Sequence, residues 1–299
     1  MRKTKLNFRQ LYFCRNCGKT FVDDEMAGKT YSPKIITNTL CAYNLGNTLE
    51  ESANNTNRRF KVNISKSAVH SWLKEFSNIC TYNKLRTDFL KDYGKNVLFE
   101  KTFEHNGLNY DFQYHIPKLE SFCVNGFSGL GNYLKGFEAG CPDYFKKIED
   151  RCSQVKINIS VRKEGKYNNA CRLAELALHA CDRNKERHSV VENFMLINDS
   201  STVACEVPVW LFEKNLNASI CGHIDVLQIR NGRVYVLDFK PDAAFENVEK
   251  VASQLFFYAS GLSFRTKIKL ENFRCAWFDD NVYYEFSPKD AKVNFQMRN

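Results

Sequence analysis

The chain has 299 residues, of which 43% are hydrophobic and 26% are charged, so it is long enough for a sizeable core and for two or three domains. No run of 18 apolar residues is present and the basic amino terminus lacks the apolar stretch of a signal peptide, which excludes a membrane span and predicts a cytoplasmic protein. Most of the net charge of +9 lies in residues 1–100, with 17 Lys and Arg against 9 Asp and Glu, and a basic front predicts a polyanionic partner, first of all DNA.

A partial zinc-ribbon knuckle is predicted in residues 1–30. Cys14 and Cys17 are separated by two residues and followed by Gly18, a spacing that lets both thiolates face one ion. A structural zinc site needs four ligands, and the chain has no second C-x-x-C pair. Zn²⁺ binding is therefore one interpretation of this pair, and the alternative is a redox pair or a chance spacing of two cysteines.

Three short helices are predicted in residues 31–80. The first begins at Pro33, which suits the first helical position, and ends near Asn44. A second opens on the capping box that runs from Thr48 to Glu51. Ser65 caps the third, whose apolar face consists of Val69, Trp72, Leu73 and Phe76.

The third helix has polar and basic residues on its free face, which is the plan of a helix-turn-helix DNA-binding domain. An ordinary amphipathic surface helix is the alternative. The side chains expected to contact DNA are Lys66, Ser67, His70, Ser71 and Lys74.

Residues 8–76 resemble the amino-terminal part of certain prokaryotic insertion-sequence transposases, in which a Y-x-C-x-x-C-G-x-x-F stretch ends a zinc ribbon and precedes a helix-turn-helix. The sequence differs in that it begins at Met1, where the first cysteine pair of the ribbon is expected upstream. The resemblance therefore implies the helix-turn-helix and leaves the zinc site open. Residues 81–150 show little periodicity and are predicted to form a connector, to which the sequence assigns no role.

Residues 151–299 predict an α/β domain with a mixed sheet. A helix over 168–184 precedes an apolar strand over 203–213, and two further strands over 219–229 and 233–239 are joined by an Asn-Gly hairpin turn. Next come a helix over 246–262 and a hairpin over 273–286. The sequence leaves the oligomeric state open, with a dimer as one option.

Acidic residues close two of these apolar strands. The hairpin places Asp225 beside Asp238, and two adjacent carboxylates are costly unless a cation lies between them. Oxygen ligands favour Mg²⁺ or Mn²⁺. Strand alternation places Lys240 on the same face as Asp238, where its ammonium can stabilise charge on a phosphate. A simple Asp–Lys ion pair at a strand end is the competing interpretation.

The motifs G-H-I-D, L-D-F-K and Q-L-F-F-Y, in this order, resemble the PD-(D/E)xK nucleases of the RecB-like branch over residues 168–286. The resemblance implies a restriction-endonuclease-like fold, a mixed sheet flanked by helices. It also implies a catalytic set that consists of Asp225, Asp238, Lys240, Gln254 and Tyr258. The metal ligands that it implies in addition to the two aspartates are Glu206 on the preceding strand and either His179 or Glu175 on the first helix.

Together these features predict a Mg²⁺- or Mn²⁺-dependent deoxyribonuclease, directed by an amino-terminal DNA-binding domain and linked to a mobile element or its host. One alternative is a non-catalytic DNA-binding regulator with a relic nuclease fold. A transposase with three catalytic carboxylates is a second alternative, and the lysine of the D-x-K motif argues against it.

Overall fold

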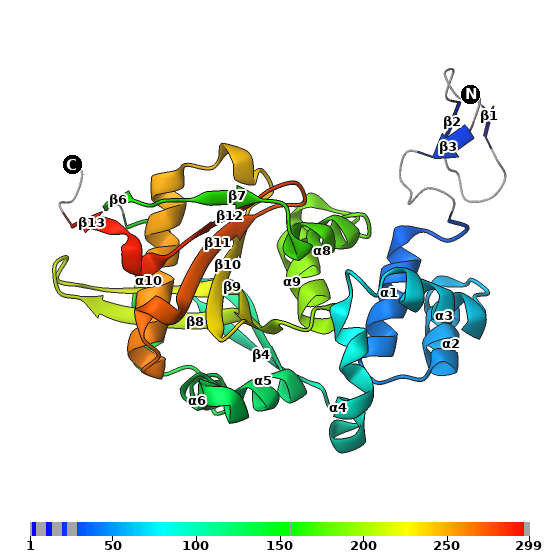
Figure 1. Ribbon diagram of the computed structural model, residues 1–299, viewed down its shortest axis with the longest axis horizontal. Helices are drawn as coiled ribbons and strands as arrows, with labels where there is room; N and C mark the ends of the chain where they lie inside the picture. Colours follow the sequence, from blue (N-terminus) through cyan, green and yellow to red (C-terminus); the bar gives the residue numbers. More distant parts are fainter. Residues whose placement is uncertain (1, 4–9, 14–19, 23–28, 156, 296–299) are drawn as a thin grey trace.

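The computed structural model describes residues 2–3, 10–13, 20–22, 29–155 and 157–295 (Figure 1). Close to the amino terminus, β1 (Arg2–Lys3), β2 (Gln10–Phe13) and β3 (Thr20–Val22) form a small antiparallel sheet in this order. Cys14 and Cys17, and with them the predicted zinc knuckle, lie outside the described residues.

Three helices follow where the sequence predicts them: α1 (Pro33–Asn44), α2 (Leu49–Phe60) and α3 (Lys66–Glu75). The capping box at the start of α2 is formed, because the Thr48 hydroxyl accepts a hydrogen bond from the Glu51 N–H at 3.1 Å and the Glu51 carboxylate accepts one from the Thr48 N–H at 2.8 Å. The Ser65 hydroxyl caps α3 by accepting a hydrogen bond from the Ala68 N–H at 3.2 Å. Local capping therefore fixes where these helices begin.

An eight-stranded mixed sheet is the largest element, in the order β4-β5-β8-β9-β10-β11-β12-β7. All neighbours are antiparallel except β10 and β11, which are parallel and are joined through helix α10 (Val248–Thr266). The strands are β4 (Leu98–His105), β5 (Leu108–His115), β7 (Glu164–Lys166), β8 (Thr202–Glu213), β9 (Ala218–Arg230), β10 (Arg233–Phe239), β11 (Phe273–Phe278) and β12 (Tyr283–Phe286). The strands β6 (Asn158–Ser160) and β13 (Lys292–Asn294) pair with each other.

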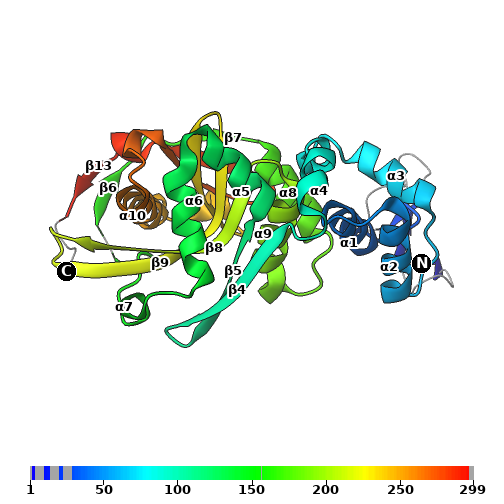
Figure 2. The ribbon, with the colours of Figure 1, turned by 90° about the horizontal axis from the view of Figure 1, so that it is seen from below.

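Helices cover both faces of this sheet (Figures 1 and 2). The helices α8 (Asn169–Leu178) and α9 (Arg187–Asn198) lie on one face, while α10 lies on the other with α6 (Ser128–Lys135) beside it. Successive side chains of β10 point to opposite faces of the sheet. Val236 packs into the core shared with α10, and Leu237 packs into the core shared with α8 and α9. Asp238 is thereby directed to the α10 side.

The helices α1–α3 share a core with the sheet domain rather than standing apart from it. Ile36 and Leu40 of α1 are fully buried in the same cluster as Met195 of α9. The Asn44 amide also donates a hydrogen bond to Asn198 Oδ1 at 2.8 Å. The buried face of α1 is therefore covered in part by α8 and α9.

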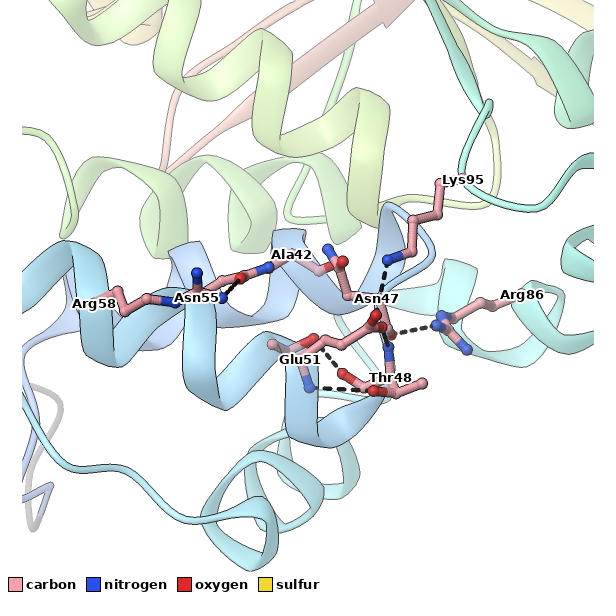
Figure 3. A network of polar contacts seen from close by, with 9 residues as sticks. Ala42, Asn47, Thr48, Glu51, Asn55, Arg58, Arg86 and Lys95 are labelled. Atoms are coloured by element: carbon pink, nitrogen blue, oxygen red, sulfur yellow. Dashed lines mark hydrogen bonds and ion pairs between the residues drawn. The ribbon is translucent and has the colours of Figure 1, made fainter.

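A polar network fixes the α1–α2 turn to the next segment of the chain (Figure 3). Arg86, in α4 (Arg86–Tyr93), donates hydrogen bonds from Nε to Tyr43 O at 2.7 Å and from Nη2 to Asn47 O at 2.6 Å. Lys95 Nζ reaches Glu51 Oε1 at 3.0 Å. These contacts hold the α1–α2 turn and the start of α2 against α4 and the loop that leads into β4.

The segment predicted as a connector contributes to the sheet itself. Its strands β4 and β5 form a hairpin that joins the sheet through β8, so the sheet begins earlier in the chain than the boundary predicted at residue 151. The short helices α5 (Ile116–Phe122) and α7 (Asp143–Lys146) follow. Among the described helices, none is both long and apolar enough to cross a membrane.

Candidate active site

Three neighbouring strands place their acidic residues in one row across the sheet. The pairing of β9 with β10 ends at Val226 and Leu237, and the next residues outward on the two strands are Asp225 and Asp238, as the hairpin predicts. On the other side of β9, Cys205 pairs with Val226 and Val207 with Ile224, which puts Glu206 opposite Asp225. Acidic residues of β8, β9 and β10 therefore occupy neighbouring positions on three adjacent strands.

Asp238 is the most buried of the three, with 1% of the residue exposed. Lys240 Nζ lies 2.6 Å from Asp238 Oδ2, an ionic contact, and the Lys240 backbone N–H donates to Phe278 O at 2.9 Å, which fixes the end of the strand. Burial disfavours the charge on Lys240, but the carboxylates of Asp238 and Asp225 outweigh this, so the pKa of Lys240 is raised. The ammonium is thus held charged beside the acidic row.

The surroundings of Asp225 and Glu206 disfavour the ionised form of both carboxyl groups. The Asp225 carboxylate accepts a hydrogen bond from the Phe239 N–H at 3.0 Å, yet burial and the nearby charge of Asp238 raise its pKa well above the usual range. Burial, followed by the charges of Asp111 and Asp238, raises the pKa of Glu206 to about 7. Glu206 also has a φ of 50°, a left-handed conformation that is uncommon outside glycine and asparagine.

A fourth carboxylate, Glu192 on α9, completes the cluster and was not predicted from the sequence. It is 4% exposed, and its Oε1 atom has no hydrogen-bond partner. Burial, followed by the charges of Glu206, Asp225 and Asp238, raises its pKa well above the usual range. The available signal was an acid within an otherwise apolar helical turn, VVENFML, because a buried glutamate without a partner is costly.

Gln254 and Tyr258 on α10 lie on the face of the sheet to which Asp238 is directed, the face opposite α9. The Gln254 amide donates to Asp238 Oδ1 at 3.3 Å and to the Tyr258 hydroxyl at 3.0 Å. Both side chains are buried, one helical turn apart. Their contacts position Asp238, and they are suited to orienting a substrate rather than to reacting with it.

The glycine of the G-H-I-D motif makes room for this tyrosine. A Cβ atom at Gly222 would lie 2.4 Å from Tyr258 Cε1 and 2.8 Å from its hydroxyl. We therefore expect Gly222→Ala to displace the ring, break the Gln254 contact, destabilise the fold by about 1–3 kcal/mol and reduce any activity of the site. Thermal melting checks this, with Gly136→Ala as the control because a Cβ there meets nothing within 4 Å. Equal melting temperatures for both variants would contradict the role of Gly222.

The remaining predicted residues lie elsewhere. Glu175 on α8 is exposed and accepts a hydrogen bond at its Oε2 atom from the Tyr167 hydroxyl at 3.2 Å. His179, the residue that caps the carboxyl end of α8, is exposed as well, and the structure shows neither of them in contact with the acidic row. The five residues predicted to contact DNA are all exposed on α3: Lys66, Ser67, His70, Ser71 and Lys74.

The donor set of the row fits a hard divalent cation. Glu192 Oε1 is an orphaned buried oxygen, and Asp238 Oδ2 has only the ionic contact to Lys240, which lacks hydrogen-bond geometry. No group of three or more His, Cys, Asp or Glu side chains is already gathered for an ion within the part of the chain that the structure describes. This is compatible with Mg²⁺, which keeps several waters and is commonly held by one or two carboxylates.

Comparison of the sequence with models of protein families, with curated proteins and with solved structures finds no match. What the site does has to be argued from its own residues.

Proposed function

We propose that this chain is a Mg²⁺- or Mn²⁺-dependent deoxyribonuclease with a restriction-endonuclease-like catalytic domain. The observation that carries the proposal is the row formed by Glu206, Asp225 and Asp238, with Lys240 at 2.6 Å from the last of them. A protein gains nothing in stability from burying Glu192, Glu206 and Asp225 near one another, since burial and neighbouring negative charges raise the pKa of each of these three groups. Such an arrangement is typical of a functional site.

The acidic residues of the row would act as metal ligands, and Lys240 beside them would supply a positive charge. Asp225 and Asp238 would hold the ion, with Glu206 and Glu192 as further oxygen donors. A bound Mg²⁺ or Mn²⁺ ion supplies a Lewis acid that neutralises charge on a phosphate oxygen. Lys240 would orient the attacking water and stabilise the negative charge that develops on the phosphoryl group. The site is therefore suited to the hydrolysis of a phosphodiester.

Cleavage assays with the purified full chain test the proposal. Single-stranded and duplex DNA and a matched RNA would each be incubated with magnesium, with manganese and with a chelator. We expect DNA to be cleaved only when a divalent ion is present. DNA binding without cleavage under all these conditions would contradict the proposal and favour a non-catalytic regulator.

We further propose that α1–α3 form a helix-turn-helix whose α3 contacts DNA, which is supported by the five exposed polar and basic residues of that helix. Replacing Lys66 and Lys74 together with Gln should weaken binding about three- to tenfold and reduce the dependence of affinity on salt, because each phosphate contact releases a counterion. Salt-dependent fluorescence anisotropy with the full chain measures both quantities.

The matched control replaces Lys214 and Lys292 with Gln. Both lysines are exposed; Lys214 lies in the β8–β9 turn and Lys292 in β13, at the far end of the molecule from α3 (Figure 1). An equal loss of affinity in both double variants would show that charge alone, and not α3, accounts for binding.

A further inference from the structure

A cavity of about 140 Å³ adjoins the carboxylate row, and some of its lining residues come from outside the nuclease-like sequence motifs. Glu206, Asp225 and Tyr258 are among its lining residues. The lining also includes His105 of β4, Tyr110 of β5, Arg151 and Ser153 of the segment after α7, and His223 of β9.

Two of the lining residues, His223 and Arg151, carry groups that can bind an anion. His223 is 6% exposed, and its Nε2 atom has no hydrogen-bond partner. Tyr110 holds the imidazole in place, with the two rings stacked at a centroid distance of 3.5 Å and an interplanar angle of 9°.

Arg151 is the positively charged residue among those that line the cavity. It is half-buried, and it forms no ion pair with a carboxylate among the described residues, although Glu206 and Asp225 line the same cavity. A guanidinium without an ion pair and two carboxyl groups thus line one cavity. A ligand that fits this lining presents negative charge to Arg151 and tolerates the two acids when a cation is bound to them.

A phosphate group has this chemistry, because its oxygens can accept hydrogen bonds from a guanidinium and an imidazole on one side and contact a divalent cation on the other. We infer that this cavity is a phosphate subsite, in which Arg151 and His223 bind a phosphate group of the nucleic acid next to the metal-binding row. The inference rests on the proposed nuclease function and specifies how its substrate is held. The phosphate can be an internal phosphodiester or a terminal phosphate, and the two have different consequences for the substrate.

Binding of inorganic phosphate to the full chain tests the subsite without turnover. Isothermal titration calorimetry at fixed pH, with and without magnesium, should show phosphate binding that magnesium strengthens, since coupling between two ligands is reciprocal. Arg151→Gln should weaken phosphate binding about tenfold or more, and Arg151→Lys should restore part of it. The control is Arg162→Gln, which removes an exposed arginine outside the cavity. Unchanged phosphate affinity in Arg151→Gln, or no phosphate binding with magnesium bound, would overturn the inference.

Oligonucleotides with a 5′-phosphate, a 3′-phosphate or hydroxyl ends distinguish the two sources of phosphate. If an end phosphate occupies the cavity, Arg151→Gln should raise KM only for the substrate that carries it. If an internal phosphodiester does so, KM should rise for all three. Equal KM for wild type and Arg151→Gln on every substrate would overturn the subsite while leaving the nuclease function intact. Absence of cleavage in the wild type, with phosphate binding still lost in Arg151→Gln, would instead remove the proposed function and retain the subsite.

Discussion

Asp225→Asn is expected to give a protein that is more stable than the wild type and inactive in DNA cleavage. Burial and Asp238 raise the pKa of Asp225, so its charge is unfavourable in the metal-free fold. An asparagine can still accept the hydrogen bond that the Phe239 N–H donates at 3.0 Å. We expect a gain of about 1–2 kcal/mol in the free energy of unfolding and a loss of at least about 100-fold in cleavage, since a charged ligand for the metal is lost.

Two companion variants separate a metal site from a simple ion pair. Asp238→Asn and Lys240→Met each remove one partner of the contact at 2.6 Å. If the ion pair is only structural, both variants lower the melting temperature, and Asp225→Asn has little effect on stability, magnesium binding or cleavage. A metal site predicts instead that Asp225→Asn and Asp238→Asn weaken magnesium binding, whereas Lys240→Met largely retains it and loses cleavage.

Chemical denaturation, calorimetric titration with magnesium and a cleavage assay, applied to the same preparations, measure these effects. Asp290→Asn is the control, because Asp290 is exposed and lies outside the row. Cleavage by Asp225→Asn at the wild-type rate would rule out Asp225 as a ligand.

Glu206→Gln is expected to change how stability depends on pH. The pKa of Glu206 rises from 4.5 to about 7 on folding, so the folded state binds a proton more tightly than the unfolded state does. The stability that this proton provides is fully present below about pH 4.5 and is lost as the pH rises through 7. A shift of this size corresponds to about 3 kcal/mol at pH 8.

Other groups titrate in the same range, so the difference between two proteins is the useful quantity. Buried His115 and His223 have lowered pKa values, and the pKa of Lys118 is lowered to about 7, which makes their contributions rise with pH. These contributions are present in both proteins and cancel in the comparison.

Urea denaturation of wild type and Glu206→Gln at pH 5, 6, 7 and 8 with a chelator present gives the difference directly. The free energy of unfolding of the variant, relative to that of the wild type, should increase as the pH rises. Added magnesium should stabilise the wild type more at pH 8 than at pH 5, because the ion binds the ionised carboxylates. A difference that does not change with pH would show that Glu206 is not a strained acid.

Much of the candidate site is encoded by short-range patterns. The two-residue Asn231-Gly232 turn pairs Arg230 with Arg233, and this register alone carries Asp225 to a position opposite Asp238. Strand alternation puts Lys240 on the same face as Asp238, and the four-residue spacing of a helix brings Gln254 to Tyr258. Each of these relations involves residues joined by one turn or one element, so the sequence by itself determined them.

The rest of the site depends on how separate elements pack. Glu192 enters the row only because α9 lies across β8 and β9, and Glu206 enters it only because β8 pairs with β9 in the register observed. Arg151 and Tyr110 reach the same cavity from segments with little periodicity, which join the site through the pairing of β5 with β8 and the contact of residue 151 with Cys221. Periodicity reports the face on which a residue lies but not which distant element will cover that face, so the tertiary structure alone decided which acids and which donors meet.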